Sequence, residues 1–139
     1  MKVLFIGGTG NISMAASRLA LQRGMDLYLL NRGSRIVDLP GVKSIKADIS
    51  KPAEVAKALA GHSWDCVVNW IAFEPTEIER DLELFRGKTR QYIFISSASA
   101  YQKPATSPFI TESTPLANPY WEYSRNKIAC EERLNKALP

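Results

Sequence analysis

The sequence predicts an α/β protein with a doubly wound parallel sheet, and three observations support this prediction. Five short apolar segments alternate with four segments of helical periodicity, the pattern of a parallel sheet covered by helices on both faces. Several apolar segments are continuous rather than alternating, as in strands buried on both faces. The first segment ends in a glycine-rich turn. Right-handed crossovers then give the strand order 3-2-1-4-5, with a cleft at the carboxyl end of the first strand, where the order reverses.

The strands are predicted from short apolar runs bounded by turn residues. We expect them at residues 3–6, 27–30, 44–47, 65–71 and 91–96. The second strand ends at Asn31 and Arg32, and the third runs into Asp48.

The helices are predicted from apolar residues that recur at three- and four-residue spacing. The first carries Ile12, Ala15, Ala16 and Leu19 on one face and stops before Gly24. The other helices are expected at residues 52–60, 76–85 and 119–138.

A long loop rich in proline, serine and threonine precedes the last helix. It covers residues 101–118, and loops of this length in a compact domain are uncommon unless they serve a site. Asn118 followed by Pro119 has the pattern of an N-cap and a first helical position. The helix that they open has an apolar face. Its members are Cys130, Leu134, Ala137 and Leu138.

Length and composition indicate one ordinary globular domain. The chain has 139 residues, so residues 1–139 are expected to form a single domain around one core. No apolar run approaches the length of a membrane span, so no membrane partner is predicted. The formal net charge is +4, but the lysines and arginines are scattered, which favours a small anionic ligand over general RNA binding.

The two cysteines carry no sign of a metal site. Cys66 lies in an apolar run and Cys130 in a helical pattern, and the chain has a single histidine. Without metal-ligand spacing, both are expected to be reduced thiols in the core, which points to a cytoplasmic protein.

The glycine-rich turn has the outline of a nucleotide site. It joins an apolar strand to a helix, whose free backbone N–H groups can bind a phosphate. Gly7 allows the sharp bend, and Gly8 and Gly10 let the backbone approach a pyrophosphate. Ser13 stands where a third glycine would allow close packing of helix on strand. A tight strand-to-helix connection has the same appearance, so the motif alone leaves both interpretations open.

Tyr123 and Lys127 are four residues apart in the last predicted helix, and residues at this spacing share one face. A cation beside a phenol favours the ionised form, so the pair can act as a proton acceptor. Ser97 follows the fifth strand, where its hydroxyl can bind a substrate oxygen. Ser96 and Ser99 are alternatives for that role. In isolation, the tyrosine and lysine would be interpreted as an exposed polar pair.

Together these motifs resemble the extended branch of the short-chain dehydrogenase/reductase superfamily. The resemblance rests on GGTGNIS at residues 7–13, on Asp48-Ile49, on Ser97 and on Tyr-x-x-x-Lys at residues 123–127. Within this superfamily, the chain resembles the NAD-dependent epimerases and dehydratases of nucleotide sugars, including atypical members related to chloroplast stem-loop RNA-binding proteins. The resemblance covers essentially the whole chain and implies a Rossmann-like fold.

The resemblance implies roles for individual residues. Ser97, Tyr123 and Lys127 would form the catalytic set, with Lys127 also binding the nicotinamide ribose. The implied cofactor contacts are Gly7, Gly10, Asn11 and Ile12 for the pyrophosphate, Asp48 and Ile49 for the adenine, and Trp70 to Ala72 for the ribose. The implied activity is hydride transfer on a nucleotide sugar, assisted by the catalytic set.

Two positions depart from the resembled family. Its sugar dehydratases carry an acidic pair directly after the active-site hydroxyl residue, where this chain has Ala98 and Ser99, so an epimerase or reductase is favoured over a dehydratase. Its NAD-preferring members end the second strand with an acidic residue, where this chain has Asn31 and Arg32. These side chains match a 2′-phosphate better, so the expected cofactor is NAD(P), with NADP preferred.

The resemblance also bears on what the chain can do alone. Extended members are much longer and place their last strands and substrate-binding part after the Tyr-Lys helix. We therefore expect residues 1–139 to be an incomplete form that binds cofactor with little or no turnover. The alternative is a binding module for NAD(P) or RNA that keeps the fold without catalysis. The resemblance further implies a homodimer formed through the helices near residues 76–85 and 120–138.

Overall fold

The computed structural model describes residues 1–34 and 38–137, and the chain divides into two compact units. Unit 1 comprises Met1–Ile71 and Leu82–Ile95, and unit 2 comprises Ala72–Asp81 and Ser96–Pro139. The division falls within helix α3, Pro75–Phe85. The sheet therefore belongs to unit 1, and helix α4, Glu122–Asn135, belongs to unit 2.

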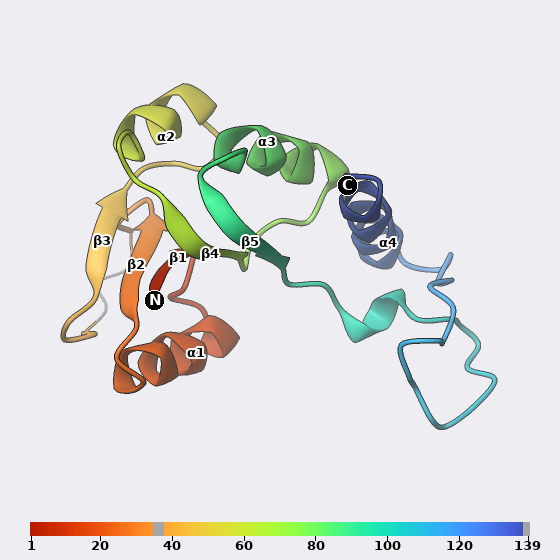
Figure 1. Ribbon diagram of the computed structural model, residues 1–139. Helices are drawn as coiled ribbons and strands as arrows, with labels where there is room; N and C mark the ends of the chain where they lie inside the picture. The colour runs from red at the N-terminus through yellow and green to blue at the C-terminus, as the bar shows by residue number, and fades with distance from the viewer. Residues whose placement is uncertain (35–37, 138–139) are drawn as a thin grey trace. The chain divides into compact units, whose positions relative to one another are not determined.

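Unit 1 contains a five-stranded sheet in which all pairs are parallel (Figure 1). Its strands are β1 Lys2–Ile6, β2 Asp26–Asn31, β3 Lys43–Lys46, β4 Trp64–Asn69 and β5 Thr89–Phe94. Their order is β3-β2-β1-β4-β5, so the predicted order is confirmed. In the register, Val3 of the central strand pairs with Leu27 on one side and Cys66 on the other.

The fourth and fifth strands end earlier than the apolar runs predict. β4 stops at Asn69, and its side-chain Oδ1 accepts a hydrogen bond of 2.8 Å from the Ile71 backbone N–H. A side chain that bonds to the backbone two residues later turns the chain out of the strand direction. The backbone carbonyl of Asn69 also accepts from the N–H of Ile95, just beyond the end of β5 (3.2 Å). The Asn69 side chain therefore turns β4 out of the strand direction two residues before the apolar run ends.

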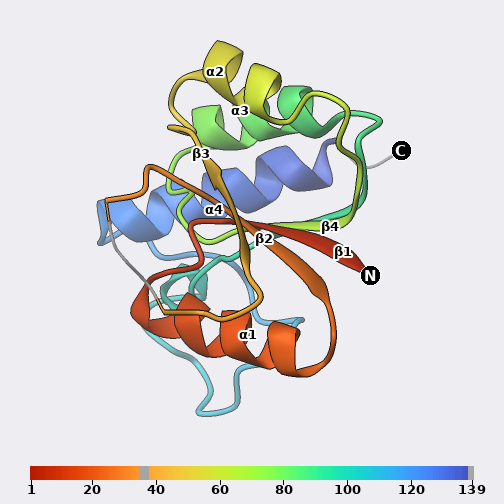
Figure 2. The ribbon, with the colours of Figure 1, turned by 90° about the vertical axis from the view of Figure 1, so that its left-hand side faces the viewer.

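Helices cover both faces of the sheet, as predicted. Helix α1, Asn11–Gln22, lies on one face and α2, Pro52–Ala58, on the other (Figure 2). Successive strand residues point to opposite faces and so build two cores. The core under α2 contains Leu4, Ile6, Leu30, Val55, Leu59, Val67, Leu84 and Phe85. The core under α1 contains Val3, Phe5, Ala20, Leu27, Leu29, Leu39, Cys66 and Val68.

The predicted apolar face of the first helix is wrong at three of its four residues, and only Ala16 packs, half-buried, against the core. Ile12 and Leu19 are 77% and 47% exposed, whereas Ser13, Ser17 and Ala20 are buried. The physical reason is close approach of the helix to the turn after β1, which only small side chains allow. The Ser17 hydroxyl donates to the Gly8 carbonyl at 2.9 Å, so a polar side chain on this face is satisfied without water.

Unit 2 contains the 3-10 turn η1, Ala98–Ala100, helix α4 and the first part of α3. The two helices are joined by an ion pair between Glu79 and Arg133, whose Oε1 and Nε atoms are 3.0 Å apart. Between η1 and α4 runs the predicted long loop, in which Tyr101 and Leu116 form one antiparallel bridge.

The start of the last helix differs from the prediction. Helix α4 begins at Glu122 with Trp121 as its N-cap, so Asn118 is not the cap. Asn118 is instead buried, and its Oδ1 accepts from the Tyr120 backbone N–H at 3.2 Å. Its Nδ2 donates to the Ser99 carbonyl, nineteen residues earlier, at 2.7 Å, and this long-range contact competes with its local capping preference.

The predicted apolar face of α4 is correct at one end only. Cys130 is fully buried, but Leu134 is half-buried and Ala137 is exposed. Leu138 lies outside the described residues. The buried face of α4 carries Ser124 and Lys127 together with Cys130, so it is more polar than the sequence pattern predicts.

Candidate functional site

The glycine-rich loop links β1 to α1 with two residues in the left-handed region. Gly7 has φ +95° and Gly8 has φ +86°. The Gly7 N–H donates to the Leu30 carbonyl of β2 at 2.9 Å. A Cβ at Gly8 would lie 2.5 Å from Leu29 Cδ2 and 3.3 Å from Phe5 Cβ. Gly8 is therefore the residue that permits close packing of the loop on the sheet, a role that the sequence pattern assigns to the third position of the motif.

The helix start is organised by serine hydroxyls. Gly10 is the N-cap of α1, and its N–H donates to Ser13 Oγ at 2.9 Å, while that hydroxyl lies 3.3 Å from the Gly10 carbonyl. Ser17 holds the Gly8 carbonyl from the next turn of the helix. Sequence reasoning assigned neither of these tasks. The available signal was a pair of serines four residues apart in this helix.

The loop and helix start suit a dinucleotide pyrophosphate. Asn11 and Ile12 form the exposed first turn of a 12-residue helix, and that turn carries no acidic side chain. Backbone N–H groups in a first turn have no intrahelical partner, and the helix dipole adds partial positive charge there. The donor set is therefore neutral to cationic, as an anion requires.

The ends of β2 and β3 bring further predicted residues to the same sheet edge as the glycine loop. Asn31 Oδ1 accepts from the Gly33 N–H at 2.8 Å, and Arg32 is exposed beside it. Asp48 accepts from the Ser50 N–H (3.0 Å) and hydroxyl (2.8 Å). These hydrogen bonds, with a contribution from the charge of Arg32, lower the pKa of the Asp48 carboxyl.

Two of the predicted cofactor-binding residues in unit 1 have side chains that pack against other side chains of the same unit. Ile49 is buried in the core under α2, so only its backbone can face a ligand. Trp70 packs edge-on against Phe5 with ring centroids 5.4 Å apart. Its buried Nε1 has no hydrogen-bond partner among the described residues. Both residues thus border the sheet edge through their main chain.

Lys127 of α4 is a deeply buried charged group of unit 2. It is 2% exposed, and its Nζ donates to the Ala72 carbonyl at 2.7 Å. Desolvation by burial lowers the pKa of Lys127, while the nearby Glu77 and Glu131 act in the opposite direction. The backbone carbonyl of Ala72 is thus the hydrogen-bond acceptor for the buried ammonium of Lys127.

Tyr123 lies beside the lysine on α4. Lys127 Nζ is 5.6 Å from the centroid of the Tyr123 ring, so the two share one face of the helix. The half-buried phenol ring lies between Trp121 and Phe73, at centroid distances of 4.8 and 6.1 Å. Because both neighbouring aromatic rings are largely exposed, the phenol belongs to an aromatic surface.

Ser97 is held by the turn that follows it. It caps η1, and its Oγ accepts from the Ser99 N–H at 3.2 Å and lies 2.9 Å from Ser99 Oγ. The Ser96 hydroxyl instead donates to Glu131 of α4. Of the three serines that the sequence left as alternatives, Ser97 and Ser99 are thus hydrogen-bonded to each other, whereas the Ser96 hydroxyl is bonded to the Glu131 carboxylate.

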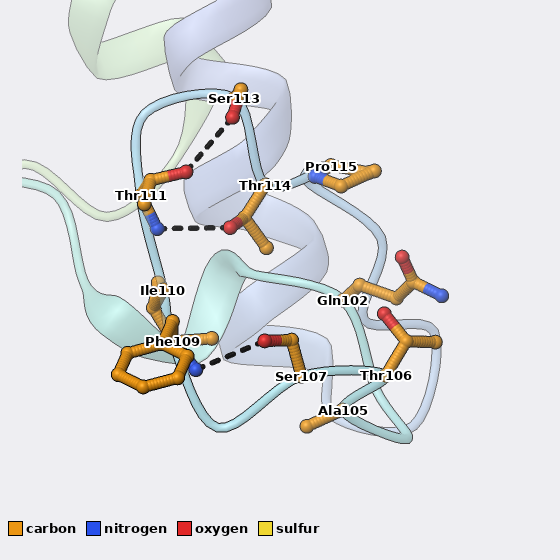
Figure 3. A pocket seen from close by; sticks show the side chains of 10 residues that line it. All are labelled: Gln102, Ala105, Thr106, Ser107, Phe109, Ile110, Thr111, Ser113, Thr114 and Pro115. Atoms are coloured by element: carbon orange, nitrogen blue, oxygen red, sulfur yellow. Dashed lines mark hydrogen bonds between the residues drawn. The ribbon is translucent and has the colours of Figure 1, made fainter.

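Unit 2 also contains a cavity of about 240 Å³ within the long loop (Figure 3). Its hydroxyls bond within the loop: Ser107 Oγ accepts from the Phe109 N–H at 3.1 Å, and Thr114 Oγ1 accepts from the Thr111 N–H at 3.0 Å. None of the predicted site residues lines it. Its hydroxyl groups therefore organise the loop itself.

The described residues place two further limits on the site. They contain no group of three or more His, Cys, Asp or Glu side chains that would bind a metal ion. Among the same residues, no helix has both the length and the hydropathy needed to cross a membrane.

A glycine-rich loop between the first strand and helix of a 3-2-1-4-5 parallel sheet defines the class of Rossmann-like dinucleotide-binding folds. Within this class of folds, the chain also carries Tyr123 and Lys127 on one helix, after a turn that is capped by Ser97. The chain belongs to the NAD dependent epimerase/dehydratase family, whose profile matches residues 3–137.

Known proteins extend this result. The chain is 30% identical, over 125 residues, to the chloroplast stem-loop binding protein of 41 kDa b from Arabidopsis thaliana, covering 80% of this chain and 33% of that protein. Its fold is similar to that of the UDP-Glc/GlcNAc 4-epimerase of Campylobacter jejuni (TM-score 0.83, 24% identity, 98% of this chain and 48% of that one). It is also similar to UDP-glucose 4-epimerase of Bifidobacterium longum, solved with NAD+ and UDP (TM-score 0.84, 21% identity, 99% and 49%). The chain thus spans a third to a half of these proteins' lengths.

Proposed function

We propose that this chain is the dinucleotide-binding part of an NAD(P)-dependent epimerase or reductase that acts on a nucleotide sugar. The observation that carries the proposal is the family match over residues 3–137 in a chain that retains Ser97, Tyr123 and Lys127. The 4-epimerases of similar fold, one of them solved with UDP, support the substrate class.

In this proposal the cofactor is held by the sheet edge of unit 1 and by the main chain after β4. The first-turn N–H groups at Gly10, Asn11 and Ile12 bind the pyrophosphate beside Gly7. Arg32 and Asn31 bind a 2′-phosphate, because a guanidinium matches phosphate oxygens and no carboxylate ends β2. The remaining proposed contacts are Asp48 and the Ile49 main chain at the adenine, and Trp70 and Ala72 at the ribose.

The proposed chemistry divides among the three catalytic residues. A bound nicotinamide supplies hydride acceptance and return. Tyr123 takes the proton of the substrate hydroxyl, and Ser97 donates a hydrogen bond to the same oxygen and orients it. The Lys127 ammonium, 5.6 Å from the centroid of the phenol ring, supplies a positive charge on the same face of α4.

Water elimination is not part of the proposal. The positions after Ser97 are Ala98 and Ser99, and neither carries a carboxyl group that can act as the acid or base for removing water. An epimerase or reductase requires only the proton and hydride transfers assigned above.

Cofactor choice is tested by titrating the purified protein with NADPH and NADH and following nucleotide fluorescence. Tighter binding of NADPH is expected. Arg32→Asp should move the preference towards NADH, because the carboxylate repels a 2′-phosphate and accepts from a 2′-hydroxyl. Arg23→Asp, an exposed change at the end of α1, makes the same charge change as a control. An unchanged NADPH-to-NADH ratio in Arg32→Asp would overturn the cofactor assignment.

Turnover is tested with UDP-glucose and UDP-galactose. Residues 1–139 are proposed to bind cofactor with little or no turnover, since the chain spans about half the length of the similar epimerases. Robust epimerisation or reduction by this chain alone would contradict that part of the proposal.

A second candidate is an RNA-binding module on the same fold. The printed name of the Arabidopsis relative and the net charge of +4 favour it. A short stem-loop RNA titrated at several salt concentrations separates the two candidates. Tight, salt-sensitive RNA binding without any NADPH or NADH binding would favour the module over the enzyme.

Homodimer formation through α3 and α4 is also proposed, from the resemblance to the family. Sedimentation equilibrium of the purified chain at several concentrations tests it. A monomer at all concentrations would exclude a stable dimer of residues 1–139.

A further inference from the structure

The long loop of unit 2 is closed at its base by backbone hydrogen bonds. The Gln102 N–H donates to the Pro115 carbonyl at 2.8 Å, and the Lys103 N–H donates to the Ala117 carbonyl at 2.9 Å. The residues that follow Ser99 are therefore paired with the residues that precede Asn118. This pairing returns the chain to η1 before α4 begins.

Asn118 directly follows the paired residues at the base of the loop, and its side-chain amide has several hydrogen-bond partners. The side chain is 7% exposed. Its Nδ2 donates to the Ser99 carbonyl at 2.7 Å and lies 3.3 Å from Ser124 Oγ. Its Oδ1 accepts from the Tyr120 N–H at 3.2 Å. A primary amide has two N–H donors and one carbonyl acceptor, so its polar atoms are matched in one plane.

The partners of this amide adjoin the two proposed catalytic residues. Ser99 bonds to Ser97 through both its N–H and its hydroxyl. Ser124 is fully buried and directly follows Tyr123 on α4. One buried side chain therefore joins the turn that carries the serine to the helix that carries the tyrosine.

We propose that Asn118 is a positioning residue that sets Ser97 relative to Tyr123. The inference rests on the proposed function in one respect, namely that the two hydroxyls act on one substrate oxygen. Placement of reacting groups depends on such supporting bonds, because a small displacement is costly when two groups must meet one atom. Buried hydrogen-bonded networks also hold one arrangement, since a lost partner leaves a buried polar group unsatisfied.

Local NMR signals of the two hydroxyl residues test the proposal without requiring turnover. Tyrosine labelled with ¹³C at Cζ and serine labelled with ¹³C at Cβ report on the two positions, and Tyr123→Phe and Ser97→Ala assign the signals. Asn118→Asp keeps the shape and the acceptor but removes both donors. It is expected to shift the resonances of both Tyr123 and Ser97, whereas Asn135→Asp, an exposed change on α4, shifts neither.

Two further variants test the two sides of the hydrogen-bond network separately, one on α4 and one at η1. Ser124→Ala removes one acceptor and is expected to shift the Tyr123 signal alone. Ser99→Ala leaves its backbone carbonyl in place and is expected to shift the Ser97 signal alone. If Asn118→Asp leaves either resonance unmoved, the proposal is overturned. Asn118→Ala provides the same test should the aspartate variant fail to fold.

Nucleotide titration keeps this inference distinct from the proposed function. If the wild-type chain binds neither NADPH nor NADH but the resonance pattern holds, the cofactor assignment fails and the positioning role stands. If the wild-type chain binds NADPH but Asn118→Asp leaves both resonances in place, the positioning role fails and the cofactor assignment stands.

Discussion

The two units differ in what they bury. The interior of unit 1 consists mainly of aliphatic and aromatic side chains in two cores on either face of the sheet. The fully buried side chains of unit 2 include the polar or charged Asp81, Ser124 and Lys127, as well as Ile78 and small residues such as Ala100 and Cys130. Apolar burial is non-directional, whereas a buried polar group is stable only with partners in fixed directions. Unit 1 is therefore suited to stability, and unit 2 to holding particular atoms in place.

The exceptions in unit 1 support the same distinction. Among the described residues of unit 1, the buried polar side chains are Ser13 and Ser17 behind the glycine loop and Asn69 at the end of β4. All three lie near the carboxyl ends of the central strands, where the cofactor is proposed to bind. In unit 1, the described buried polar residues thus accompany the proposed cofactor site rather than the middle of the core.

The largest effect is expected from the apolar core of unit 1. Leu4 is fully buried in the centre of the sheet, so Leu4→Ala should lower the free energy of unfolding by about 3–5 kcal/mol. Leu19→Ala, at an exposed position of α1, should change it by less than about 0.5 kcal/mol. Urea denaturation of both variants measures the difference. Equal losses would contradict the stabilising role assigned to the apolar core of unit 1.

The second largest loss of stability is expected from a substitution in the glycine-rich loop. Gly8→Ala places a Cβ 2.5 Å from Leu29 Cδ2 on a residue with positive φ, and we expect a loss of about 2–3 kcal/mol. Gly24→Ala is the matched control, because its φ is also positive but nothing lies within 4 Å of the added carbon. That variant should lose about 1 kcal/mol. Similar losses in thermal unfolding would show that packing at Gly8 adds nothing to the backbone cost.

The buried thiol of Cys130 in unit 2 should make the free energy of unfolding depend on pH in the alkaline range. Burial raises the pKa of Cys130 from 9.0 to about 11. Between these values the folded state keeps a proton that the unfolded state releases, so this thiol makes stability fall as pH rises, by at most about 1.4 kcal/mol per pH unit. Cys130→Ala should therefore lose less stability than wild type from pH 9 to 11. Parallel curves in urea titrations would contradict the burial of this thiol.

Cys66 of unit 1 serves as a comparison for this measurement. Burial raises its pKa too, so its thiol contributes with the same sign. The Cys66→Ala variant should show a smaller alkaline loss than wild type. An alkaline loss larger than that of wild type would conflict with the direction of this pKa shift.

The smallest effect is expected from the exposed ion pair of unit 2. Glu79 and Arg133 join α3 to α4, but both side chains are substantially exposed to solvent. A double-mutant cycle with Glu79→Ala and Arg133→Ala should give a coupling of about 0.2–1 kcal/mol. A coupling well above this range would mean that surface charges, rather than the buried polar groups, hold the helices of unit 2.

Sequence reasoning was most successful where one physical signal dominates. Continuous apolar runs predicted the strands and their order, because buried parallel strands leave few alternatives for chain direction. The glycine-rich turn was found for the same reason, since positive φ at Gly7 and Gly8 is accessible mainly to glycine. The shared face of Tyr123 and Lys127 followed from helix geometry alone.

The errors arose where long-range contacts compete with local preference. Ile12 and Leu19 have the spacing of a buried face, but the approach of α1 to Gly8 selects Ser13 and Ser17 instead. Asn118 has the local features of a helix cap, yet its amide bonds to Ser99, nineteen residues earlier in the chain. Periodicity and capping rules describe neighbours in sequence and do not include such partners.

The sequence by itself determined the strand order, the nucleotide-type loop and the family of this protein, because these depend on local patterns of hydrophobicity, glycine and residue spacing. Only the tertiary structure decided that Gly8 is the close-packed glycine, that serines form the buried face of α1, and that Asn118 joins η1 to α4. The physical reason is that each of these depends on which atoms meet after folding, and a buried polar group is defined by its partners rather than by its own position in the chain.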